Sequence, residues 1–428
     1  MKRVLLVAYA FPPVGGAGVQ RVVKFIKYFH SLGWTADAVS ALNPSVPLVD
    51  ESLLKELPAD CAVYRSKTLE PSYAVKALMK ESESGRQTLK SLLVGSAKKL
   101  ANYFLLPDAQ VLWWPHTLVL LSRLLKEKKH DVVFVSGPPF STFFITVFIA
   151  KRYGIPVVID YRDEWSFSRD NWENSVKTPL ARLIDSWMEQ YVIKYSRAIT
   201  VASPYYKISL EKMFPFSSGK IKTITNGYDP KDFEKIDFDS ENNRNNSSFT
   251  IVYTGTVWRA TSLAPFMEGV CILSEKEPSI ASQIKLRIIG RIVAEESHII
   301  EQLKKHIQVE TLNYLPHEEI FPEIVSADLL LLTLSDLDGA GKIIPGKTFE
   351  YLAAPIPVLA VIPEGVTSEI IKNEKNVFII SPGDSNRIAE VLGTLVKNPC
   401  ERTRREGIEK YSRPYLTKQL VELFETIT

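Results

Sequence analysis

Residues 131–165 read DVVFVSGPPFSTFFITVFIAKRYGIPVVIDYRDEW and contain two short apolar runs, VVFV at 132–135 and PVVI at 156–159. Strands that are buried on both faces of a parallel sheet read as short apolar runs of this kind. Each run ends in polar residues, Ser136-Gly137-Pro138-Pro139 after the first and Asp160-Tyr161-Arg162-Asp163 after the second. Because ligands of open α/β sheets bind beyond the carboxyl ends of strands, these two turns are predicted to contribute to a site.

Strand-like and helix-like segments alternate along the chain, which is typical of a parallel sheet with crossover helices. The sequence therefore predicts the α/β class. In the first half we expect strands at Arg3–Ala8, Asp37–Ser40, Ala62–Arg65, Val132–Val135, Val157–Ile159, Ala198–Val201 and Lys222–Thr225. In the second half we expect them at Phe249–Tyr253, Lys285–Ile289, Leu329–Thr333 and Pro357–Val361.

The segment 232–248 is polar, rich in asparagine and without apolar periodicity, as expected of an exposed linker. It divides the chain into a Rossmann-like N-terminal domain, 1–231, and a Rossmann-like C-terminal domain, 249–411. The remaining residues, 412–428, are expected to form a helix that could pack back on the N-terminal domain.

The composition is that of a globular protein, with 428 residues of which 45% are hydrophobic. The 52 basic and 49 acidic residues leave a formal charge of +3, so nothing in the overall charge favours a nucleic-acid partner. Cys61, Cys271 and Cys400 lie far apart and form no CxxC pair, which predicts reduced thiols in a cytoplasmic protein.

The first predicted strand is followed by a glycine-rich loop, residues 11–18, which opens a helix with an apolar face. Gly15 and Gly16 would allow backbone amides to approach an anionic diphosphate or a sugar at the start of this helix. The alternative is a tight strand-to-helix turn without a ligand. Arg21, one turn into the helix, is expected to be a surface charge.

Several motifs together resemble family 4 of the retaining glycosyltransferases, which have the two-domain architecture called GT-B. They are FPPVGGAGVQR, SPYYKISLEK followed by ITNGYD, YTGTVWR and KTFEYLAAPIPVLA, and they span nearly the whole chain. SGPPFS and GIPVVIDYRDEW look most like a subgroup involved in bacterial surface polysaccharide assembly. The resemblance implies two Rossmann-like domains facing across a cleft, a nucleotide-sugar donor, and a glycan or lipid-linked saccharide acceptor.

On the donor side, Lys347 and Glu350 lie three residues apart, which places them on one face of a helix. By resemblance Glu350 binds the ribose and Lys347 could reach the diphosphate, whereas the alternative is a surface salt bridge. The preceding loop could present amides to the phosphates and the sugar, and its candidate residues are Gly341, Ile343 and Ile344.

The sequence departs from the family pattern at two points of the donor site. Lys342 stands where the family commonly has a glutamate, so the usual contact to the donor sugar is in doubt. Thr256 directly follows Gly255, where the family tends to have an arginine and a lysine nearby. Arg259 is our substitute for the diphosphate contact, and the alternative is a solvated loop arginine.

On the acceptor side, many family members have a histidine after the second apolar run, and this chain has Arg162 and Asp163. A carboxylate within hydrogen-bond reach can draw the proton from an attacking sugar hydroxyl. Asp163 is the first candidate and Asp160 the second, with Arg162 pairing with one of them. The turn Ser136, Gly137 and Pro138 is assigned to the acceptor side. The alternative is that all of these charges form a structural ion-pair network.

No metal ion or other cofactor is expected. Asp336-Leu337-Asp338 matches the DxD pattern of metal-dependent transferases, but such patterns are common in loops. The six histidines form no HxxxH or HExxH pattern.

Residues 86–106 and the following Val111-Leu112-Trp113-Trp114-Pro115 combine leucines, aromatic residues and lysines, as an interfacial helix would. They predict peripheral contact with the inner face of the cell membrane, although an amphipathic helix packed on its own domain fits equally well. A membrane span over Val132–Ala150 is disfavoured because Gly137-Pro138-Pro139 interrupts it.

The sequence thus favours a retaining glycosyltransferase. Two alternatives stay open at this point: a non-hydrolysing epimerase that acts on a nucleotide-sugar, and a non-catalytic glycan-binding protein of the same architecture.

Overall fold

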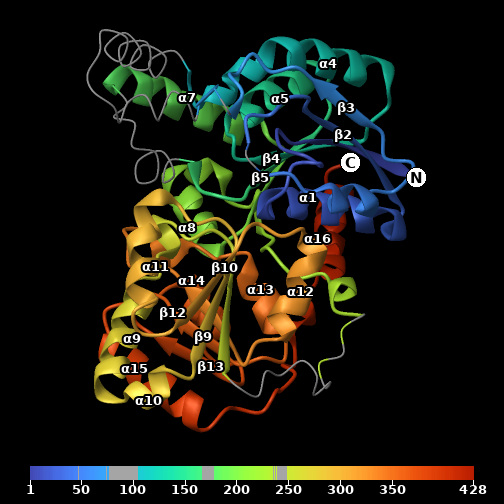
Figure 1. Cartoon of the computed structure of the whole chain (residues 1–428). Helices are drawn as coiled ribbons and strands as arrows, with labels where there is room; N and C mark the ends of the chain where they lie inside the picture. Colours follow the sequence, from blue (N-terminus) through green and yellow to red (C-terminus); the bar gives the residue numbers. More distant parts are fainter. Residues whose placement is uncertain are drawn as a thin grey trace. The chain divides into compact units, whose positions relative to one another are not determined.

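The computed structural model describes residues 1–46, 48–73, 75–76, 105–165, 178–234, 236, 238 and 248–428. Contacts between residues divide the chain into two compact units (Figure 1). Unit 1 contains Met1–Thr225 and Thr417–Thr428, and unit 2 contains Asn226–Leu416. Most of the predicted linker, 232–248, lies outside the described residues.

Unit 1 is built on a parallel sheet of seven strands in the order β3-β2-β1-β4-β5-β6-β7. All seven predicted strands are present, with small shifts at their ends. They are β1 Lys2–Val7, β2 Trp34–Ala41, β3 Val63–Ser66, β4 Val132–Gly137, β5 Val157–Tyr161, β6 Ala198–Val201 and β7 Ile221–Thr223.

The strand order of unit 1 reverses between β1 and β4, which pair in parallel with Leu6 opposite Phe134. β2 and β3 lie on one side of this pair, and β5, β6 and β7 lie on the other. This is the order of a Rossmann-like fold, and its ligands bind at the carboxyl ends of the strands where the order reverses. The turn after β4 therefore lies at the favoured position for a site.

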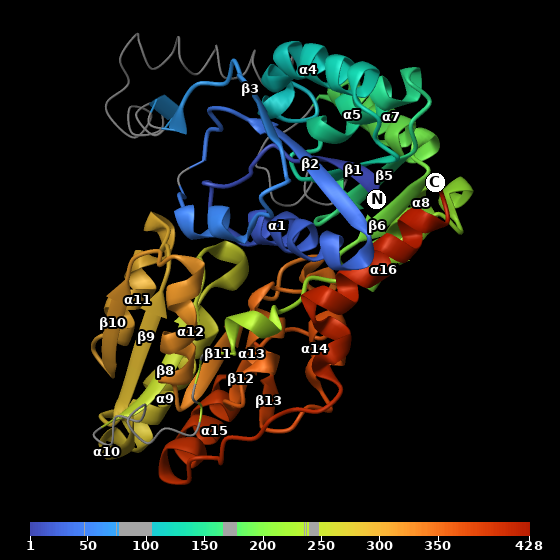
Figure 2. The ribbon, with the colours of Figure 1, turned by 90° about the vertical axis from the view of Figure 1, so that its right-hand side faces the viewer.

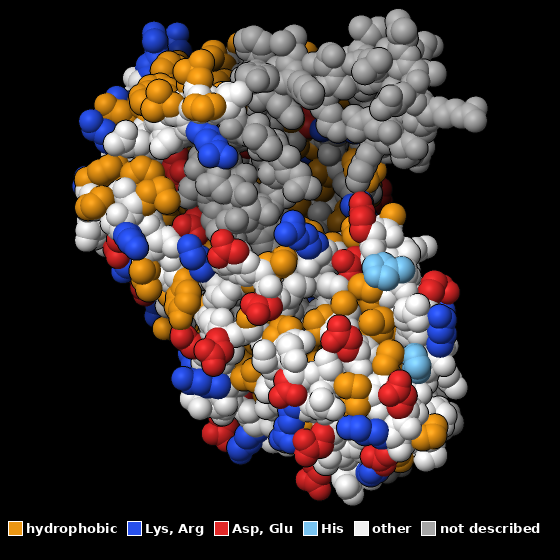
Figure 3. Space-filling view, turned by 90° about the vertical axis from the view of Figure 1, so that its left-hand side faces the viewer, with side chains coloured by type: hydrophobic (Ala, Val, Ile, Leu, Met, Phe, Trp, Pro, Cys, Tyr) orange, Lys and Arg blue, Asp and Glu red, His pale blue; other side chains and the backbone are white. Residues whose placement is uncertain are grey.

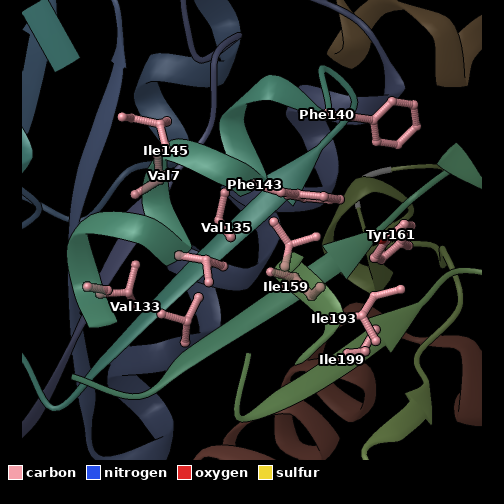
Figure 4. Packing of buried hydrophobic residues seen from close by; sticks show 14 of the residues in the cluster. Val7, Val133, Val135, Phe140, Phe143, Ile145, Ile159, Tyr161, Ile193 and Ile199 are labelled. Carbon is pink, nitrogen blue, oxygen red and sulfur yellow. The ribbon is translucent and has the colours of Figure 1, made fainter. Parts of the chain in front are cut away.

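Helices connect these strands, and the core lies between them and the sheet. β4 and β5 are buried along their whole length, and Phe143 of α5 covers Val135 and Ile159 (Figure 4). The helices are α1 Ala17–Phe29, α4 Trp114–Glu127, α5 Ser141–Arg152, α7 Pro179–Tyr195 and α8 Pro204–Met213. Short 3₁₀ turns are η1 His30–Leu32, η2 Glu51–Glu56, η3 Ala109–Trp113 and η5 Pro215–Ser217.

The last helix, α16 Arg413–Glu425, follows unit 2 in the sequence, but its residues from Thr417 on belong to unit 1 (Figure 2). Phe424 is completely buried, with ring-centroid distances of 5.3 Å to Trp34, 5.9 Å to Phe29 and 5.8 Å to Phe134. The indole Nε1 of Trp34 donates a hydrogen bond of 2.8 Å to Glu425. α16 thus completes the core of a unit whose other residues end at Thr225.

Unit 2 contains a parallel sheet of six strands in the order β10-β9-β8-β11-β12-β13, which reverses between β8 and β11. Both units therefore have Rossmann-like sheets, and the prediction of the α/β class with two such domains is confirmed. The strands are β8 Phe249–Thr254, β9 Ile284–Ile289, β10 Gln308–Leu312, β11 Leu329–Thr333, β12 Val358–Val361 and β13 Val377–Ile380. β10 and β13, the two edge strands, were not among the predicted strands.

The helices of unit 2 pack on this sheet, and their apolar residues form a second core around Ile251, Leu331 and Leu359. They are α9 Ala264–Lys276, α10 Pro278–Ala281, α11 Ser297–Leu303, α12 His317–Val325, α13 Lys347–Ala353, α14 Val366–Ile371 and α15 Ser385–Lys397. The 3₁₀ turns are η6 Pro230–Asp232, η8 Arg259–Thr261, η9 Ala294–Glu296, η10 Ala340–Lys342 and η11 Ile408–Tyr411.

Candidate functional site

Arg162 fastens the turn after β4 to the start of α1, at the point where the sheet of unit 1 reverses. Its guanidinium donates to the carbonyl oxygens of Gly18 at 2.8 Å, Gly137 at 3.3 Å and Pro138. A Cβ on Gly18 would lie 2.4 Å from Arg162 Nη1, so a larger residue at this position would displace the guanidinium. Burial lowers the pKa of Arg162, and the charges of Asp163 and Asp160 oppose that shift. The three carbonyl contacts give Arg162 a structural role.

Asp160 lies next to the carboxyl end of β5, with its side chain in the core of unit 1. Its completely buried carboxylate accepts hydrogen bonds from Arg21 Nη2 at 2.8 Å and from Ser136 and Thr200 at 2.7 Å each. Burial alone would raise the pKa of Asp160, but the charge of Arg21 and these hydrogen bonds outweigh it and lower the pKa. An acceptor cannot reach this carboxylate, so we reassign Asp160 from second candidate base to structural ion-pair partner.

Arg21 corrects one expectation. It is completely buried and not a surface charge, and it forms an ion pair with Asp160. It also donates to the carbonyl oxygens of Ile224 at 2.8 Å and Thr225 at 2.7 Å. Because an unpaired buried charge is unfavourable, these partners explain how α1 can hold an arginine in the core.

Asp163 is the acidic residue of this turn whose side chain reaches solvent, because Asp160 and Glu164 are both buried. Desolvation by the surrounding protein raises the pKa of Asp163, and the charge of Arg162 opposes it. Asp163 in turn contributes to the raised pKa of Tyr206, which is due mainly to burial. Asp163 thus combines access to solvent with a raised proton affinity.

The other acceptor-side candidates line the same turn mainly through their backbone. The Ser136 hydroxyl is buried and donates to Asp160. A Cβ on Gly137 would lie 2.8 Å from the ring of Phe143, so this position is closely packed. Pro138 is half-buried, and its carbonyl oxygen accepts a hydrogen bond from Arg162.

The glycine-rich loop opens α1 as expected, with Gly16 as the residue before the helix at φ 107. The carbonyl oxygen of Gly16 accepts from the amides of Val19 and Gln20. The amide of Gly15 donates to the carbonyl oxygen of Leu48 at 3.1 Å. The Gly15 amide is therefore engaged within the protein, and the ligand contacts assigned to Gly15 and Gly16 stay predictions.

In unit 2, Lys347 lies at the carboxyl end of β8, next to the point where the sheet reverses. Its half-buried ammonium donates to the carbonyl oxygen of Thr254 at 2.7 Å and lies 3.4 Å from the ring centroid of Tyr253. A Cβ on Gly255 would be 3.7 Å from Lys347 Nζ, so the ammonium borders this glycine. Burial lowers the pKa of Lys347 well below its usual range, and the charge of Glu350 opposes that shift.

Glu350 is half-buried one turn along α13, and its charge acts on Lys347. Tyr351, one residue further, accepts a hydrogen bond from the amide of Thr254 at 3.0 Å and shares a second one with the Thr254 hydroxyl at 3.1 Å. Lys347 and Tyr351 thus fix α13 to the end of β8. The Lys347 and Glu350 side chains are therefore held at the carboxyl end of β8 by the helix that carries both of them.

The turn after β8 is closely packed against the turn after β9. Gly255 and Gly290 have φ values of 111 and 136, and a Cβ on Gly290 would lie 2.4 Å from the Gly255 carbonyl oxygen. The carbonyl oxygen of Thr256 accepts from the hydroxyls of Tyr253 and Thr261. These contacts define the backbone around Gly255, beside which Lys347 lies.

Arg259 begins η8 and has an exposed side chain. Its carbonyl oxygen accepts from the Ser335 hydroxyl at 2.7 Å, and Ser335 follows β11. Arg259 is therefore placed near the carboxyl ends of β8 and β11, which are neighbours in the sheet.

The loop after β11 contains the remaining donor candidates. The amide of Ile343 donates to Ala340 at 3.0 Å, and its carbonyl oxygen accepts from Thr367 at 2.6 Å. A Cβ on Gly341 would lie 2.7 Å from the Glu364 carbonyl oxygen, and Ile344 is almost completely buried. Because the Ile343 amide has a partner in the protein, the phosphate contacts expected from this loop stay predictions.

Two other expectations concern a metal ion and the membrane. Among the described residues, no group of three or more His, Cys, Asp or Glu side chains could hold a metal ion, and metal independence stays a prediction. Residues 86–104 of the expected membrane patch lie outside the described part of the chain. No helix in the part that is described has both the length and the apolar character to cross a membrane.

The residues that position the candidates were not predicted from the sequence. Tyr351 lies four residues after Lys347, so a shared helix face could have indicated their common contact with β8. Gly18 was within the glycine-rich loop, but its partner Arg162 is 144 residues away, and no local signal connects the two.

Two stretches of the chain match known protein families. Residues 84–232 match Glycosyltransferase Family 4, and residues 248–398 match Glycosyl transferases group 1. No curated protein matches the chain in sequence.

Several solved structures share the fold over essentially the whole chain. Anabaena Alr3699/HepE in complex with UDP and glucose has a TM-score of 0.61 at 13% identity, with 100% of both chains covered. Sucrose-phosphate synthase from Thermosynechococcus elongatus has a TM-score of 0.65 at 13% identity, covering 100% of this chain and 99% of that one. A mutant of S. aureus TarM, in complex with fondaparinux, alpha-GlcNAc-glycerol and UDP, has a TM-score of 0.63 at 13% identity, covering 99% of this chain and 100% of that one. At these identities the similarity concerns the fold, and together with the two family matches it indicates that the chain is a glycosyltransferase of GT-B fold, similar to family 4.

Proposed function

We propose that the chain is a retaining glycosyltransferase that transfers a hexosyl group from a nucleotide-sugar to a glycan or a lipid-linked saccharide. The observation that carries the proposal is the half-buried ammonium of Lys347, held by the Thr254 carbonyl oxygen beside Gly255. Retention of the anomeric configuration and a role in bacterial surface polysaccharide synthesis are taken from the family resemblance described above.

Lys347 is assigned to the diphosphate of the donor. A nucleoside diphosphate gains negative charge on its β-phosphate as it leaves, and a positioned cation stabilises that charge. Burial lowers the pKa of Lys347, and a phosphate would add to the charge of Glu350 in favouring the charged ammonium. Glu350, on the same helix, is assigned to the ribose hydroxyls, for which a carboxylate is a suitable acceptor.

Arg259, Thr256 and the loop with Gly341, Ile343 and Ile344 are assigned to the surroundings of the donor. UDP-sugars are the first donors to consider, because UDP or UDP-glucose is bound in the structures of Anabaena Alr3699/HepE. UDP is also present in the S. aureus TarM complex, together with a glycosylated glycerol.

Asp163 is assigned to the acceptor. Its solvent-reaching carboxylate can take the proton of a sugar hydroxyl as the glycosidic bond forms. The raised pKa means that the Asp163 carboxylate binds a proton more tightly than an ordinary aspartate does, which suits a group that takes up a proton in the reaction. The turn at Pro138, which Arg162 fixes by a hydrogen bond, lies at the same edge of the sheet as Asp163, where β4 and β5 have their carboxyl ends.

We further propose that transfer needs no metal ion and takes place in the cytoplasm, with peripheral contact to the inner membrane face. Metal independence is tested by adding EDTA to a transfer assay. Unchanged activity is expected, and loss of activity that Mg²⁺ or Mn²⁺ restores would contradict it.

A thermal-shift panel of UDP- and GDP-sugars tests donor binding. A ligand present at 100 times its dissociation constant adds about 2.7 kcal/mol to the unfolding free energy. Stabilisation by at least one nucleotide-sugar, and its loss in Glu350→Ala, are expected. If no member of the panel stabilises the protein, the proposal fails at the donor site.

Transfer itself is tested with the stabilising donor and a panel of saccharide acceptors. Asp163→Asn should lower kcat by roughly 10²- to 10⁴-fold, the usual contribution of a general base, while donor binding is retained. Asp60→Asn, an exposed acid in the loop before β3, is the matched control and should keep full activity. Equal activity of Asp163→Asn and the control would remove Asp163 from the mechanism, and donor isomerisation without transfer would favour an epimerase.

A further inference from the structure

The outer face of α4, α5 and α7 in unit 1 carries large apolar side chains. Leu183, Val119 and Trp187 have exposed fractions of 68%, 66% and 54%, and Phe148 has 48%. Phe144 joins the three helices, since its ring lies 5.4 Å from Trp114 of α4 and 5.7 Å from Trp187 of α7. Phe144 also stacks on Phe148 with ring centroids 6.3 Å apart, so the aromatic residues of the three helices are in contact. We call the exposed apolar residues of these helices the α4–α5–α7 face. Monomeric proteins rarely expose apolar side chains in such groups without a binding partner.

Basic residues predominate among the exposed charges of this face. α5 contains no acidic residue, and the two acids of α7, Asp185 and Glu189, are completely buried or nearly so. The exposed acid of α4 is Glu127, at the carboxyl end of that helix. The carboxyl ends of α5 and α7 carry the exposed residues Lys151, Arg152 and Lys194. Arg182 is exposed in the first turn of α7, and Arg123 is exposed near the carboxyl end of α4. In Figure 3, hydrophobic and basic side chains lie next to each other in the upper part of the view. The face therefore has an apolar centre with a basic border.

A hollow of about 540 Å³ lies at the end of this face, where α5 and α7 finish. It is lined by Lys151, Lys194, Arg197 and Lys220, together with Tyr195 and Ile427. No carboxylate among the described residues forms an ion pair with these four cations. Lys151 Nζ lies 3.3 Å from the ring centroid of Tyr195, and Lys220 donates to the carbonyl oxygen of Lys194 at 3.2 Å.

The hollow is separate from the candidate site. It lies at the amino ends of β5, β6 and β7, because Val157, Arg197 and Lys220 are among its lining residues. Asp163 and Pro138 lie at the carboxyl ends of β5 and β4. Four cations around one space attract a phosphate or another multivalent anion. The adjoining apolar face indicates that this anion is attached to hydrocarbon.

We infer that the hollow binds the phosphate headgroup of an anionic phospholipid while the α4–α5–α7 face lies in the membrane interface. Aromatic residues and leucines enter the boundary between headgroups and acyl chains, and the basic border contacts anionic lipids. The inference deepens the peripheral membrane contact of the proposed function, but it concerns a lipid and not the donor or acceptor.

The test is co-sedimentation of the full chain, without nucleotide, with phosphatidylcholine vesicles that contain phosphatidylglycerol. We expect binding at low ionic strength, much weaker binding to pure phosphatidylcholine, and a decrease with added salt because exposed charges are screened. Lys194→Gln combined with Arg197→Gln should lower the partition coefficient about 25-fold, since each cation near an anionic surface contributes about fivefold.

Leu180→Ser combined with Leu183→Ser should weaken binding as well, and because both leucines are more than 60% exposed, the fold should be unaffected. Lys372→Gln combined with Lys375→Gln, two exposed lysines of unit 2, is the charge-matched control and should bind like the wild type. Unfolding temperatures of all variants show whether any of them fails to fold.

Four outcomes would overturn the inference. The first two are equal binding of the Lys194/Arg197 variant and the control, and equal binding to both kinds of vesicle. The third is stabilisation by inorganic phosphate without vesicle binding. The fourth is concentration-dependent dimerisation that is lost in the leucine variant, which would assign the face to a second copy of the chain. UDP-sugar stabilisation of the same variants is measured separately, so failure of lipid binding is distinguishable from failure of the proposed function.

Discussion

Arg21 and Lys347 both lie in low-dielectric surroundings, and their different partners give them different roles. Arg21 is completely buried and has a carboxylate, Asp160, at 2.8 Å. Lys347 is half-buried, and its hydrogen bond is to a neutral carbonyl oxygen. A cation compensated by a carboxylate stabilises the fold, whereas one that faces a carbonyl oxygen can still attract an anion.

Replacing Lys347 by glutamine is expected to weaken UDP binding by roughly tenfold to hundredfold, the usual size of a hydrogen bond to a charged group. Because the pKa of Lys347 is lowered, wild-type affinity should fall as the pH rises, beginning well below pH 10.5. Titration calorimetry across pH measures both effects. Lys372→Gln serves as control, and a Lys347→Gln protein that binds UDP like the wild type would refute the assignment.

Replacing Asp160 by asparagine should lower the unfolding free energy by about 3–5 kcal/mol, because Arg21 would stay buried without its carboxylate. The folded-state pKa of Asp160 lies below its usual value. Its stabilising contribution is therefore present at neutral pH and is lost as the pH falls through that folded-state pKa.

Urea unfolding at neutral and acidic pH is the measurement for Asp160→Asn. The difference in unfolding free energy between the wild type and Asp160→Asn should become smaller at acidic pH. Glu301→Gln, which removes an exposed pair with Lys304, is the control and should leave stability unchanged. A stable Asp160→Asn protein would return Asp160 to the list of catalytic candidates.

The burial of Arg21 and Asp160 could not be predicted from the sequence. The apolar residues of α1 were placed correctly, but Arg21 and Lys24 are buried in the same helix. An amphipathic pattern assigns charged residues to the outer face, and it contains no information about a partner 139 residues away. Asp163 lies three residues beyond Asp160, and only the three-dimensional contacts separate their roles.

At the scale of elements, the buried strands were predictable and the edge strands of unit 2 were not. β11 reads LLLLT and is buried throughout, so its apolar run is a clear signal. β10 reads QVETL and is partly exposed along its length, and β13 has four residues of which three are half-buried. Edge strands bury less side-chain area, so their apolar pattern is weaker.

The contact between the turns after β8 and β9 gives a prediction at this scale. Gly290→Ala would place a Cβ 2.4 Å from the Gly255 carbonyl oxygen in a backbone conformation with φ 136. The strain should lower the unfolding free energy by about 1–3 kcal/mol and displace Gly255 from Lys347, which weakens UDP binding. Thermal shift with and without UDP measures both.

The matched control for Gly290→Ala is Gly383→Ala, where an added Cβ would meet nothing within 4 Å. Unchanged UDP binding in Gly290→Ala, despite reduced stability, would show that the Gly255 backbone does not contribute to the donor site.

For the molecule as a whole, the sequence order and the units do not coincide. The chain builds most of unit 1, passes through unit 2 and returns to unit 1 with α16. Phe424 is the residue of α16 that packs against aromatic side chains from α1, β2 and β4.

Phe424→Ala should therefore destabilise unit 1 by about 3–5 kcal/mol, as large-to-small changes of buried phenylalanines do. Scanning calorimetry should show a lower transition temperature for unit 1 and an unchanged transition temperature for unit 2. Phe216→Ala, at an exposed phenylalanine of unit 1, is the control. If both transitions moved together, the two units would unfold as one.

The late position of α16 also has a consequence for biosynthesis. A ribosome produces the part of α16 from Thr417 on only after all of unit 2, so the aromatic residues that Phe424 covers stay without this cover during most of translation. Unit 2 has its complete sequence earlier and can reach its native state first. The nascent N-terminal part must wait, with apolar surface accessible to chaperones, until the final helix emerges from the exit tunnel.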